Sequence, residues 1–176
     1  MWDLRRATLT RFTIEPGSDS AAVWTPDGRH IIFSSDRTGD VRNLWWQLAD
    51  GTGTAERLTT SPNLQNPSGV SADGTAVVFD ETPPRSPDIM RLPLTGERRA
   101  VPLLQTTFIE RNGVVSPDGR WLADESNSSG RGEIFVRPFP NTATGLSQVS
   151  TAGGTRPLLQ FSFRCSAGLK PRATPN

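Results

Sequence analysis

Short apolar segments alternate with polar turns along the chain, and the same order of segments returns at a fixed interval. In the first unit an apolar segment ends at Trp24, a polar turn follows, and the β-branched and aromatic stretch 30–34 comes next. A turn with proline followed by Asp and Gly is typical of a β-hairpin, because Gly reaches positive φ without steric cost. Two more segments, 43–48 and 55–59, complete the unit. The pattern predicts four short antiparallel strands per unit.

Asp-Gly turns mark the period of this repeat. The turn Asp residues lie 46 and 45 residues apart, and apolar positions elsewhere in the unit keep the same interval. The turns are Asp27-Gly28, Asp73-Gly74 and Asp118-Gly119, and the apolar series is Phe12, Leu58, Leu103 and Val149. Four strands in about 45 residues is the size of one β-propeller blade. We therefore predict an all-β fold, a β-propeller of four-stranded antiparallel blades with about three complete blades, as part of a ring.

The repeat covers residues 1–157, which we expect to form a partial propeller with blades at about 14–60, 61–105 and 106–151. A single blade cannot bury its apolar faces alone, so its large apolar side chains are expected to pack against neighbouring blades. These side chains are Trp24, Phe33, Trp45, Phe79, Ile89, Ile134 and Phe135.

Both ends of the sequence depart from the repeat. Trp2 aligns with Leu48, which predicts that the chain starts inside a blade. Another Asp-Gly turn is due near residue 163, where the sequence has none. We expect residues 158–176 to be an aberrant or disordered tail, produced by a reading-frame change or a truncated gene; a genuine divergent tail is the alternative.

Composition and charge narrow the choice of partners. The chain has 19 Lys and Arg against 18 Asp and Glu, a net charge of +1, which gives no reason to expect a nucleic acid. No apolar run reaches the length of a membrane span, so we expect no membrane insertion. The single Cys165 excludes an internal disulfide and a cysteine-based zinc cluster. We predict no metal and no cofactor.

Candidate catalytic groups are few. His30 is the sole histidine, and it occupies the repeat position of Ala76 and Trp121, which indicates a surface-facing strand residue. The sequence has neither a Gly-x-Ser-x-Gly elbow nor a phosphate-binding glycine loop. The sequon Asn127-Ser128-Ser129 falls on a recurring connection and is interpreted as a turn. We therefore expect no catalytic residues and no enzyme activity.

Acidic residues recur at two places in the repeat. The turn residues Asp27, Asp73 and Asp118 could bind a metal or act as an acid or base. Their recurrence in every unit favours a structural role, in which Asp accepts hydrogen bonds from nearby backbone N–H groups. The pairs Asp80-Glu81 and Asp124-Glu125 follow the turn Asp of their units and are interpreted as equivalent positions. They could bind a cation or a basic peptide; we expect solvated strand ends.

The first strand of each blade lines the axis of a propeller. Polar residues that precede each turn are therefore expected to face a channel and to hydrogen-bond a peptide or a small ligand. They are Asp19, Ser20, Gln65, Asn66, Glu110, Arg111 and Asn112.

The turn segments 24–29, 71–74 and 116–120 resemble the W-S-P-D-G-R motif of TolB-like, PD40-type (WD40-like) propeller repeats. Unit two departs from it, with Val70 and Ala72 in place of Trp and Pro. Closed rings of this family commonly have six blades, so the resemblance implies about half a ring. Four further segments resemble propellers fused to bacterial serine/threonine protein kinases: 34–37, 88–89, 136–140 and 148–154.

Two hypotheses of function follow from this resemblance. The first is a non-catalytic module, part of a larger propeller, that binds a protein or peptide as a scaffold or sensor. The second is the propeller portion of an enzyme, such as the gating domain of a prolyl-oligopeptidase-like hydrolase. The resemblance suggests a periplasmic or extracytoplasmic location and leaves the cytoplasm open. Because three blades leave two open faces, we also expect self-association.

Overall fold

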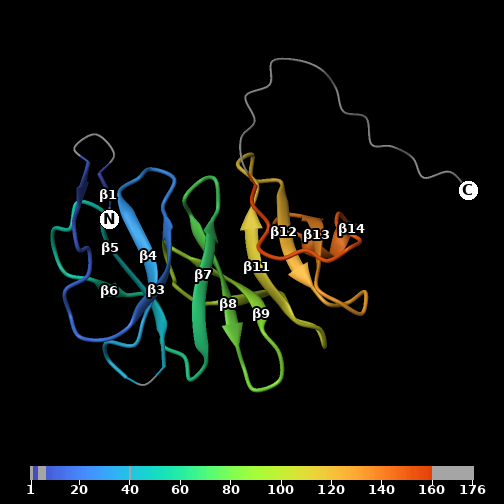
Figure 1. The fold of residues 1–176 in the computed structure, drawn as a ribbon, viewed down its shortest axis with the longest axis horizontal. Coiled ribbons are helices and arrows are strands. Elements are labelled where there is room, and N and C mark those ends of the chain that lie inside the picture. The colour runs from blue at the N-terminus through green and yellow to red at the C-terminus, as the bar shows by residue number, and fades with distance from the viewer. Residues whose placement is uncertain (1, 4–6, 40, 160–176) are drawn as a thin grey trace, which may run out of the picture.

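Three four-stranded antiparallel sheets follow one another along the chain in the computed structural model, which describes residues 2–3, 7–39 and 41–159 (Figure 1). Blade 1 contains β3 (Asp19–Trp24), β4 (His30–Ser35), β5 (Asn43–Leu48) and β6 (Glu56–Arg57). Blade 2 contains β7 (Leu64–Val70), β8 (Ala76–Thr82), β9 (Asp88–Pro93) and β10 (Val101–Leu104). Blade 3 contains β11 (Glu110–Val115), β12 (Trp121–Ser126), β13 (Glu133–Pro138) and β14 (Ser147–Gln148).

Strands pair with their sequence neighbours inside each sheet, so the predicted all-β fold with about three four-stranded blades is confirmed. A two-stranded pair, β1 (Trp2–Asp3) and β2 (Thr8–Leu9), precedes blade 1. Within the described ranges the one helical element is the short 3-10 turn η1 (Thr142–Thr144), and no helix there is long and apolar enough to cross a membrane. The inner strand β7 contacts both β3 and β11, which brings the first strands of the three blades together (Figure 1).

Each Asp-Gly turn is closed by the same set of hydrogen bonds. In blade 2, Asp73 Oδ1 accepts from the Ser71 hydroxyl at 2.6 Å and from the Thr75 N–H at 3.0 Å. The Ser71 oxygen in turn accepts from the Ala76 N–H at 3.0 Å, and Gly74 completes the turn with φ 71°. The turns of Asp27 and Asp118 repeat these contacts.

These hydrogen bonds favour the ionised aspartate. The hydroxyl of Ser116 and the donors of Arg120 lower the pKa of Asp118 to about 2, and the corresponding donors lower the pKa of Asp27 and Asp73. Each of the three carboxylates therefore stabilises the turn in which it lies.

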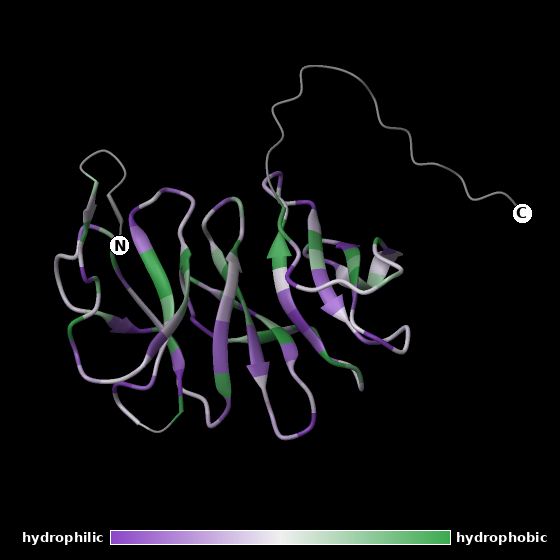
Figure 2. Ribbon diagram, in the orientation of Figure 1, coloured by the Kyte–Doolittle hydropathy of each residue, from purple (hydrophilic) through white to green (hydrophobic). Residues whose placement is uncertain are grey.

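Two apolar clusters join the blades. Between blades 1 and 2, Ile32, Leu44 and Leu58 pack with Val77, Phe79, Met90, Leu92 and Leu94. Between blades 2 and 3, Val78, Ile89 and Leu104 pack with Val115 and Leu122. Neighbouring residues of one strand thus face different blades: Val77 packs toward blade 1 and Val78 toward blade 3. Figure 2 shows the hydrophobic stretch of β4. Full burial of one such side chain contributes about 1.5–3 kcal/mol.

The far face of blade 1 is covered by the segment that precedes it. Ile31, Phe33, Trp45 and Ala49 form a third cluster, and the ring of Phe12 meets that of Phe33 edge-on at 6.2 Å between centroids. The Arg37 guanidinium lies 5.0 Å from the centroid of Phe33. The face of blade 1 that points away from blade 2 is therefore covered, although a three-bladed fragment is expected to leave it exposed.

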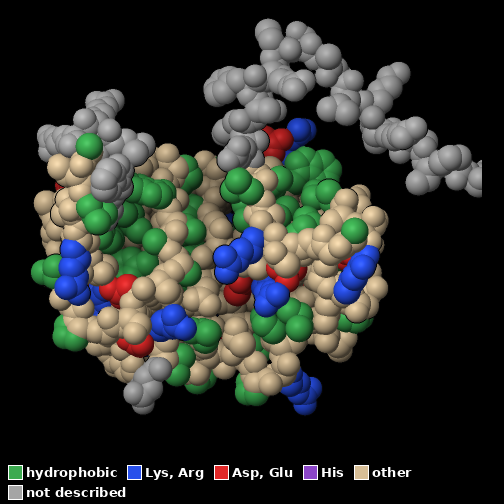
Figure 3. Space-filling model, in the orientation of Figure 1, with side chains coloured by type: hydrophobic (Ala, Val, Ile, Leu, Met, Phe, Trp, Pro, Cys, Tyr) green, Lys and Arg blue, Asp and Glu red, His purple; other side chains and the backbone are tan. Residues whose placement is uncertain are grey.

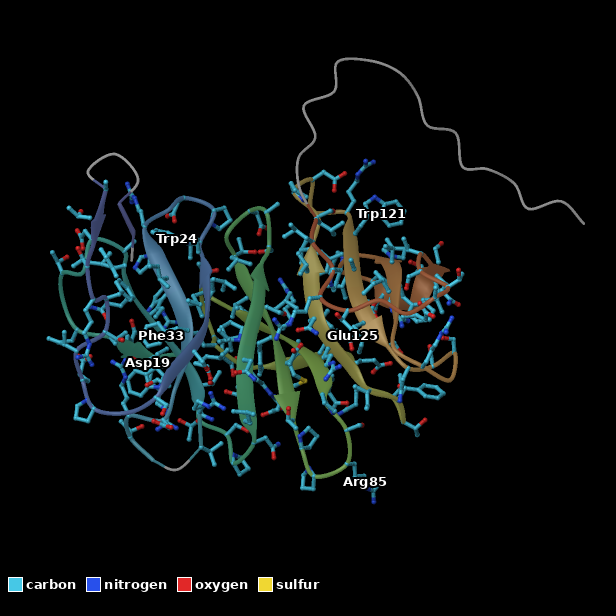
Figure 4. All side chains as sticks on the ribbon, in the orientation of Figure 1. Asp19, Trp24, Phe33, Arg85, Trp121 and Glu125 are labelled. Atoms are coloured by element: carbon cyan, nitrogen blue, oxygen red, sulfur yellow. The ribbon has the colours of Figure 1, made fainter. Side chains whose placement is uncertain are left out.

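Most of the large apolar residues are packed as expected, but one is not. Phe33, Trp45, Phe79, Ile89 and Phe135 are buried, and Ile134 is half-buried. Trp24 is 53% exposed, so its predicted position between blades is wrong. It is the last residue of β3, at the rim where the chain turns (Figure 4).

A bulge in β10 changes one member of the apolar series. Leu104 pairs with Ile89 and is 6% exposed, whereas the register shifts between Pro102 and Leu104. Leu104, rather than Leu103, therefore takes the place that Leu58 has in blade 1.

In each blade, a buried polar residue at the start of the third strand hydrogen-bonds to the segment that follows the fourth strand. Asn43 Nδ2 donates to the Ser61 carbonyl at 3.1 Å, Asp88 accepts from Gln105 Nε2 at 3.1 Å, and Glu133 accepts from the Gly153 N–H at 2.9 Å. Because each contact holds the connection to the next inner strand, these residues set how successive blades follow one another.

Cys165, the turn position near 163 and all but the first residues of the expected tail lie outside the described residues.

Candidate functional site

A groove of about 710 Å³ opens where the inner strands of the three blades meet. Arginine and acidic side chains gather over this part of the surface in Figure 3. Its lining comes from β3, β7, β8, β11 and the segment after blade 3: Ala21, Asn66, Pro67, Ser68, Asp80, Asn112, Val114, Arg156, Pro157 and Leu158.

Bulges in the inner strands shape this groove. The register shifts between Ser20 and Val23 in β3, and between Arg111 and Val114 in β11. Ala21 and Asn112 take up the extra length with φ of 51° and 56°, a left-handed conformation that Asn adopts more readily than most residues. A bulge turns backbone groups out of the ladder. The backbone N–H groups at the β11 bulge can therefore bind a side chain of the neighbouring blade.

The β11 bulge binds the carboxylate of Asp80 on β8. The Asn112 N–H donates to the two oxygens of Asp80 at 2.9 and 3.0 Å. Burial raises the pKa of Asp80 to about 6, against the lowering effect of this backbone hydrogen bond and of the nearby Arg111. Asp80 is half-buried, so it is reached from the groove and changes charge near neutral pH.

A second carboxylate fixes the side chains around the bulge. Glu125 is buried, and its Oε1 accepts from Arg111 Nε at 2.9 Å and Nη2 at 2.6 Å. Its Oε2 accepts from Asn112 Nδ2 at 2.9 Å. Figure 4 shows Glu125 midway along blade 3, away from the rim where Trp121 lies. Arg111 is thereby neutralised, and the orientation of the Asn112 amide is set.

The seven residues expected to face a channel separate into three groups. Asn66 and Asn112 line the groove, and Arg111 lies beside it in its ion pair with Glu125. Asp19 and Ser20 instead bind arginines of their own blade, Arg37 at 3.2 Å and Arg42 at 2.9 Å. Gln65 and Glu110 are buried, so these two do not present their side chains to a ligand.

The acidic pairs are not solvated strand ends, so that expectation is wrong. Asp80 and Glu81 are half-buried and accept hydrogen bonds from Asn112, Ser61 and Gln65. Asp124 and Glu125 are 0% and 3% exposed, because both are bound by arginines and pack inside the molecule. The supposed equivalence is also wrong. Asp124 pairs with Phe135 and Phe79 pairs with Met90, so Asp124 takes the place of Phe79, and Glu125 that of Asp80.

Asp124 belongs to a charged cluster between blades 2 and 3. Arg137 Nε donates to it at 2.9 Å, and burial nonetheless raises the pKa of Asp124. Burial also raises the pKa of Glu110, whose Oε1 accepts from Thr106 while Oε2 is buried without a hydrogen-bond partner.

A second cavity, of about 490 Å³, lies between the turns of blades 1 and 2. His30 lines it and stacks on Trp46 with ring centroids 4.4 Å apart, so it is half-buried rather than simply surface-facing. Among residues 7–39 and 41–159, together with 2–3, no three His, Cys, Asp or Glu side chains are placed to share a metal ion.

The sequence pattern does not predict the two charged residues of the groove, Asp80 and Arg156. Asp80 stands out in the sequence only as part of an acidic pair, because its contact with the β11 bulge joins two blades and leaves no local signal. Arg156 has φ of 52° in the segment that follows blade 3, where the repeat weakens.

Solved structures with the same arrangement of blades are TolB β-propellers. TolB of Acinetobacter baumannii superposes with a TM-score of 0.67 at 21% identity, over 84% of this chain and 36% of that one. A TolB candidate from Agrobacterium tumefaciens gives 0.66 at 17% identity, over 79% and 50%. The chain therefore has the fold of a TolB-type β-propeller, as the turn motif predicted.

The relatives found by sequence include an uncharacterised protein of Agrobacterium fabrum that is 29% identical over 146 residues. The match covers 78% of this chain and 46% of that protein, so the chain spans about half the length of its relatives. No family model matches the sequence. A puromycin-hydrolysing peptidase of Mycobacterium tuberculosis also matches, with a TM-score of 0.61 at 14% identity over 24% of its length. The resemblance to kinase-linked propellers stays a prediction.

Proposed function

We propose that this propeller segment is a non-catalytic module that binds an extended peptide or protein segment in the groove between β7 and β11. One observation carries the proposal: the groove is the place where three blades bring hydrogen-bonding groups together without a catalytic pair. Asn66, Asp80 and Asn112 supply acceptors there, and Pro67 and Val114 supply apolar surface. An extended peptide offers both backbone polar groups and side chains to such a surface.

The chemistry of the described residues supports binding rather than turnover. A hydrolytic triad needs a base within hydrogen-bond reach of a nucleophile. The His30 ring stacks on Trp46, and none of the described hydroxyl groups hydrogen-bonds to it. The carboxylates near the groove are held by a backbone N–H and by Arg111.

NMR titration of the isotope-labelled chain tests the proposal. The probes are two acetylated and amidated hexapeptides, Gly-Ser-Lys-Gly-Glu-Gly and its uncharged counterpart Gly-Ser-Gln-Gly-Gln-Gly. We expect saturable shifts in the amides of Asn66, Ser68 and Asn112, with intact peptide after prolonged incubation. Absence of saturable shifts with both peptides at millimolar concentration, or their cleavage, would overturn the proposal.

The second candidate is the propeller portion of a peptidase, which the likeness to the mycobacterial enzyme favours. The DNA that flanks this reading frame, translated in all frames, separates the two. A peptidase parent continues downstream into an α/β domain with a Gly-x-Ser-x-Gly elbow, whereas a kinase-linked propeller has its catalytic domain upstream.

A further inference from the structure

The acceptors of the groove are not saturated by the protein. Asp80 accepts the N–H of Asn112 on both oxygens and a further hydrogen bond from the backbone of Gly113, although a carboxylate offers about four lone-pair sites. The Asn112 amide nitrogen donates to Glu125, which leaves its Oδ1 as an acceptor. The Asn66 side chain has no hydrogen bond to any residue described. Three side chains, those of Asp80, Asn66 and Asn112, thus offer oxygen acceptors in the groove.

This set matches a primary ammonium group. An ammonium carries three N–H donors and no acceptor, and it binds best where a carboxylate is accompanied by further oxygen atoms. Arg111 does not occupy the site, because Glu125 holds it through two hydrogen bonds.

A cationic group lies elsewhere in the same groove. Arg156 lines it and is exposed, and it forms no ion pair with the residues that the structure describes. A guanidinium presents a planar set of donors that suits a carboxylate. Asp80 and Arg156 therefore give the groove one negative and one positive contact, neither of which is neutralised by a partner of opposite charge.

We propose that the groove recognises a peptide segment that carries both an ammonium and a carboxylate group, with Asp80 contacting the first and Arg156 the second. This inference rests on the proposed peptide-binding function and specifies its ligand: a lysine and an acidic residue close together in an extended segment. Ligands with a single charge leave one of the two contacts facing water.

The charge of Asp80 makes the ammonium contact dependent on pH. The ionisable groups around it are Arg111 and Glu125, which are paired with each other, and Arg156 across the groove. Since burial raises the pKa of Asp80 to about 6, recognition of the ammonium weakens between pH 7.5 and 5.

Calorimetry and NMR with matched peptides test the assignment. The parent is acetylated and amidated Gly-Ser-Lys-Gly-Glu-Gly; one analogue replaces Lys by norleucine and another replaces Glu by Gln. Partly exposed ion pairs contribute modestly, so each analogue is expected to bind about fivefold more weakly. Asp80→Asn removes the preference for Lys alone, and Arg156→Gln removes the preference for Glu alone. Arg85→Gln and Glu97→Gln, which alter exposed charges outside the groove, keep both preferences.

A small zwitterion separates this inference from peptide binding. 6-Aminohexanoate carries both charged groups on an alkyl chain, and we expect it to shift the Asn66 and Asn112 signals in the wild type but not in Asp80→Asn or Arg156→Gln. Equal binding of all peptides overturns the charge assignment and leaves the proposed function intact. Binding of 6-aminohexanoate without any peptide supports the charge assignment and overturns the proposed function. If neither binds, both are wrong.

Discussion

Asp124 in blade 3 lies where Phe79 lies in blade 2. Each is the residue of the second strand that pairs with the centre of the third strand, Asp124 with Phe135 and Phe79 with Met90. Arg137 likewise takes the place of Leu92, since it pairs with Leu122 as Leu92 pairs with Val77. An ion pair in blade 3 therefore replaces two apolar side chains that blade 2 packs against its neighbour.

Loss of one member of this pair should be costly. Asp124 is 0% and Arg137 12% exposed, so Arg137→Leu leaves a buried carboxylate without its cation. We expect a loss of about 3 kcal/mol in the free energy of unfolding, measured in urea.

The double variant Asp124→Phe, Arg137→Leu is the matched control. It gives blade 3 the residues that blade 2 carries at these positions, and an apolar replacement of a buried ion pair is often neutral. We expect its stability to return to within about 1 kcal/mol of the wild type. A double variant no more stable than Arg137→Leu would show that the two positions are not equivalent in packing.

The fold was accessible from sequence because its signals are local and repeated. The turn of Asp27 and Gly28 and the alternation of residues 30–34 each specify a hairpin within a few residues, and the repeat confirms them twice. The exact alignment of units was harder. A bulge in β10 shifts Leu104 into the place assigned to Leu103, and the distance from the turn Asp to the acidic pair differs by one residue between blades 2 and 3.

The turn glycines give a second prediction. Gly28 has φ of 67°, and a Cβ added there would meet no atom within 4 Å. Gly28→Ala should therefore cost about 1 kcal/mol through backbone strain alone, and Gly28→Asn less, because Asn tolerates this conformation. If the Ala and Asn variants were as stable as the wild type, the role assigned to the positive φ of Gly28 would be wrong. Thermal unfolding followed by circular dichroism makes the comparison.

The site was harder to predict than the fold because its contacts join different blades. Asn112 and Asp80 are 32 residues apart, and the bulge that aims the Asn112 N–H at Asp80 is a backbone feature with no fixed sequence signature. Polarity alone could not separate Asn66, which lines the groove, from Gln65, which is buried one position earlier.

The raised pKa of Asp80 predicts how the stability of the folded chain depends on pH. Its pKa is about 6 in the folded chain, above the ordinary value of 3.8, so the folded state holds the proton more tightly than the unfolded state. Its contribution to stability is therefore largest at low pH and declines as the pH rises from about 4 to 6. The carboxyl carbon signal of Asp80 should titrate with a midpoint near 6.

Asp118 is the internal control for this titration, because its pKa is lowered to about 2. Its contribution has the opposite sign: it is present above 3.8 and is lost as the pH falls through about 2. Asp80→Asn should flatten the decline in stability between pH 4 and 6, in which Glu110 and Asp124 also take part because their pKa values are raised. An unchanged pH profile in this variant would refute the assignment to Asp80.

Val149 gives the last prediction, on self-association. Leu58 and Leu104 hold the corresponding place in blades 1 and 2, where they are 6% exposed because the next blade covers them. Val149 follows the last strand of blade 3. Its N–H donates to the Ile134 carbonyl, as the Leu58 N–H donates to the Leu44 carbonyl, but its side chain is left open, and the residue is 63% exposed. The same apolar position is thus buried in blades 1 and 2 but exposed in blade 3, and this favours association through the face that contains Val149.

We expect the purified chain to self-associate at tens of micromolar in light scattering, and Val149→Asp to lower the average mass. Leu146→Asp is the matched control: Leu146 is 55% exposed in the same part of blade 3, but it precedes β14 rather than following it. If the open face drives association, Val149→Asp should reduce the mass more than Leu146→Asp does. A monodisperse, cooperatively folded wild-type monomer would show that the Val149 face is stable in water, because the free energy of burying it is then smaller than the entropy lost on association.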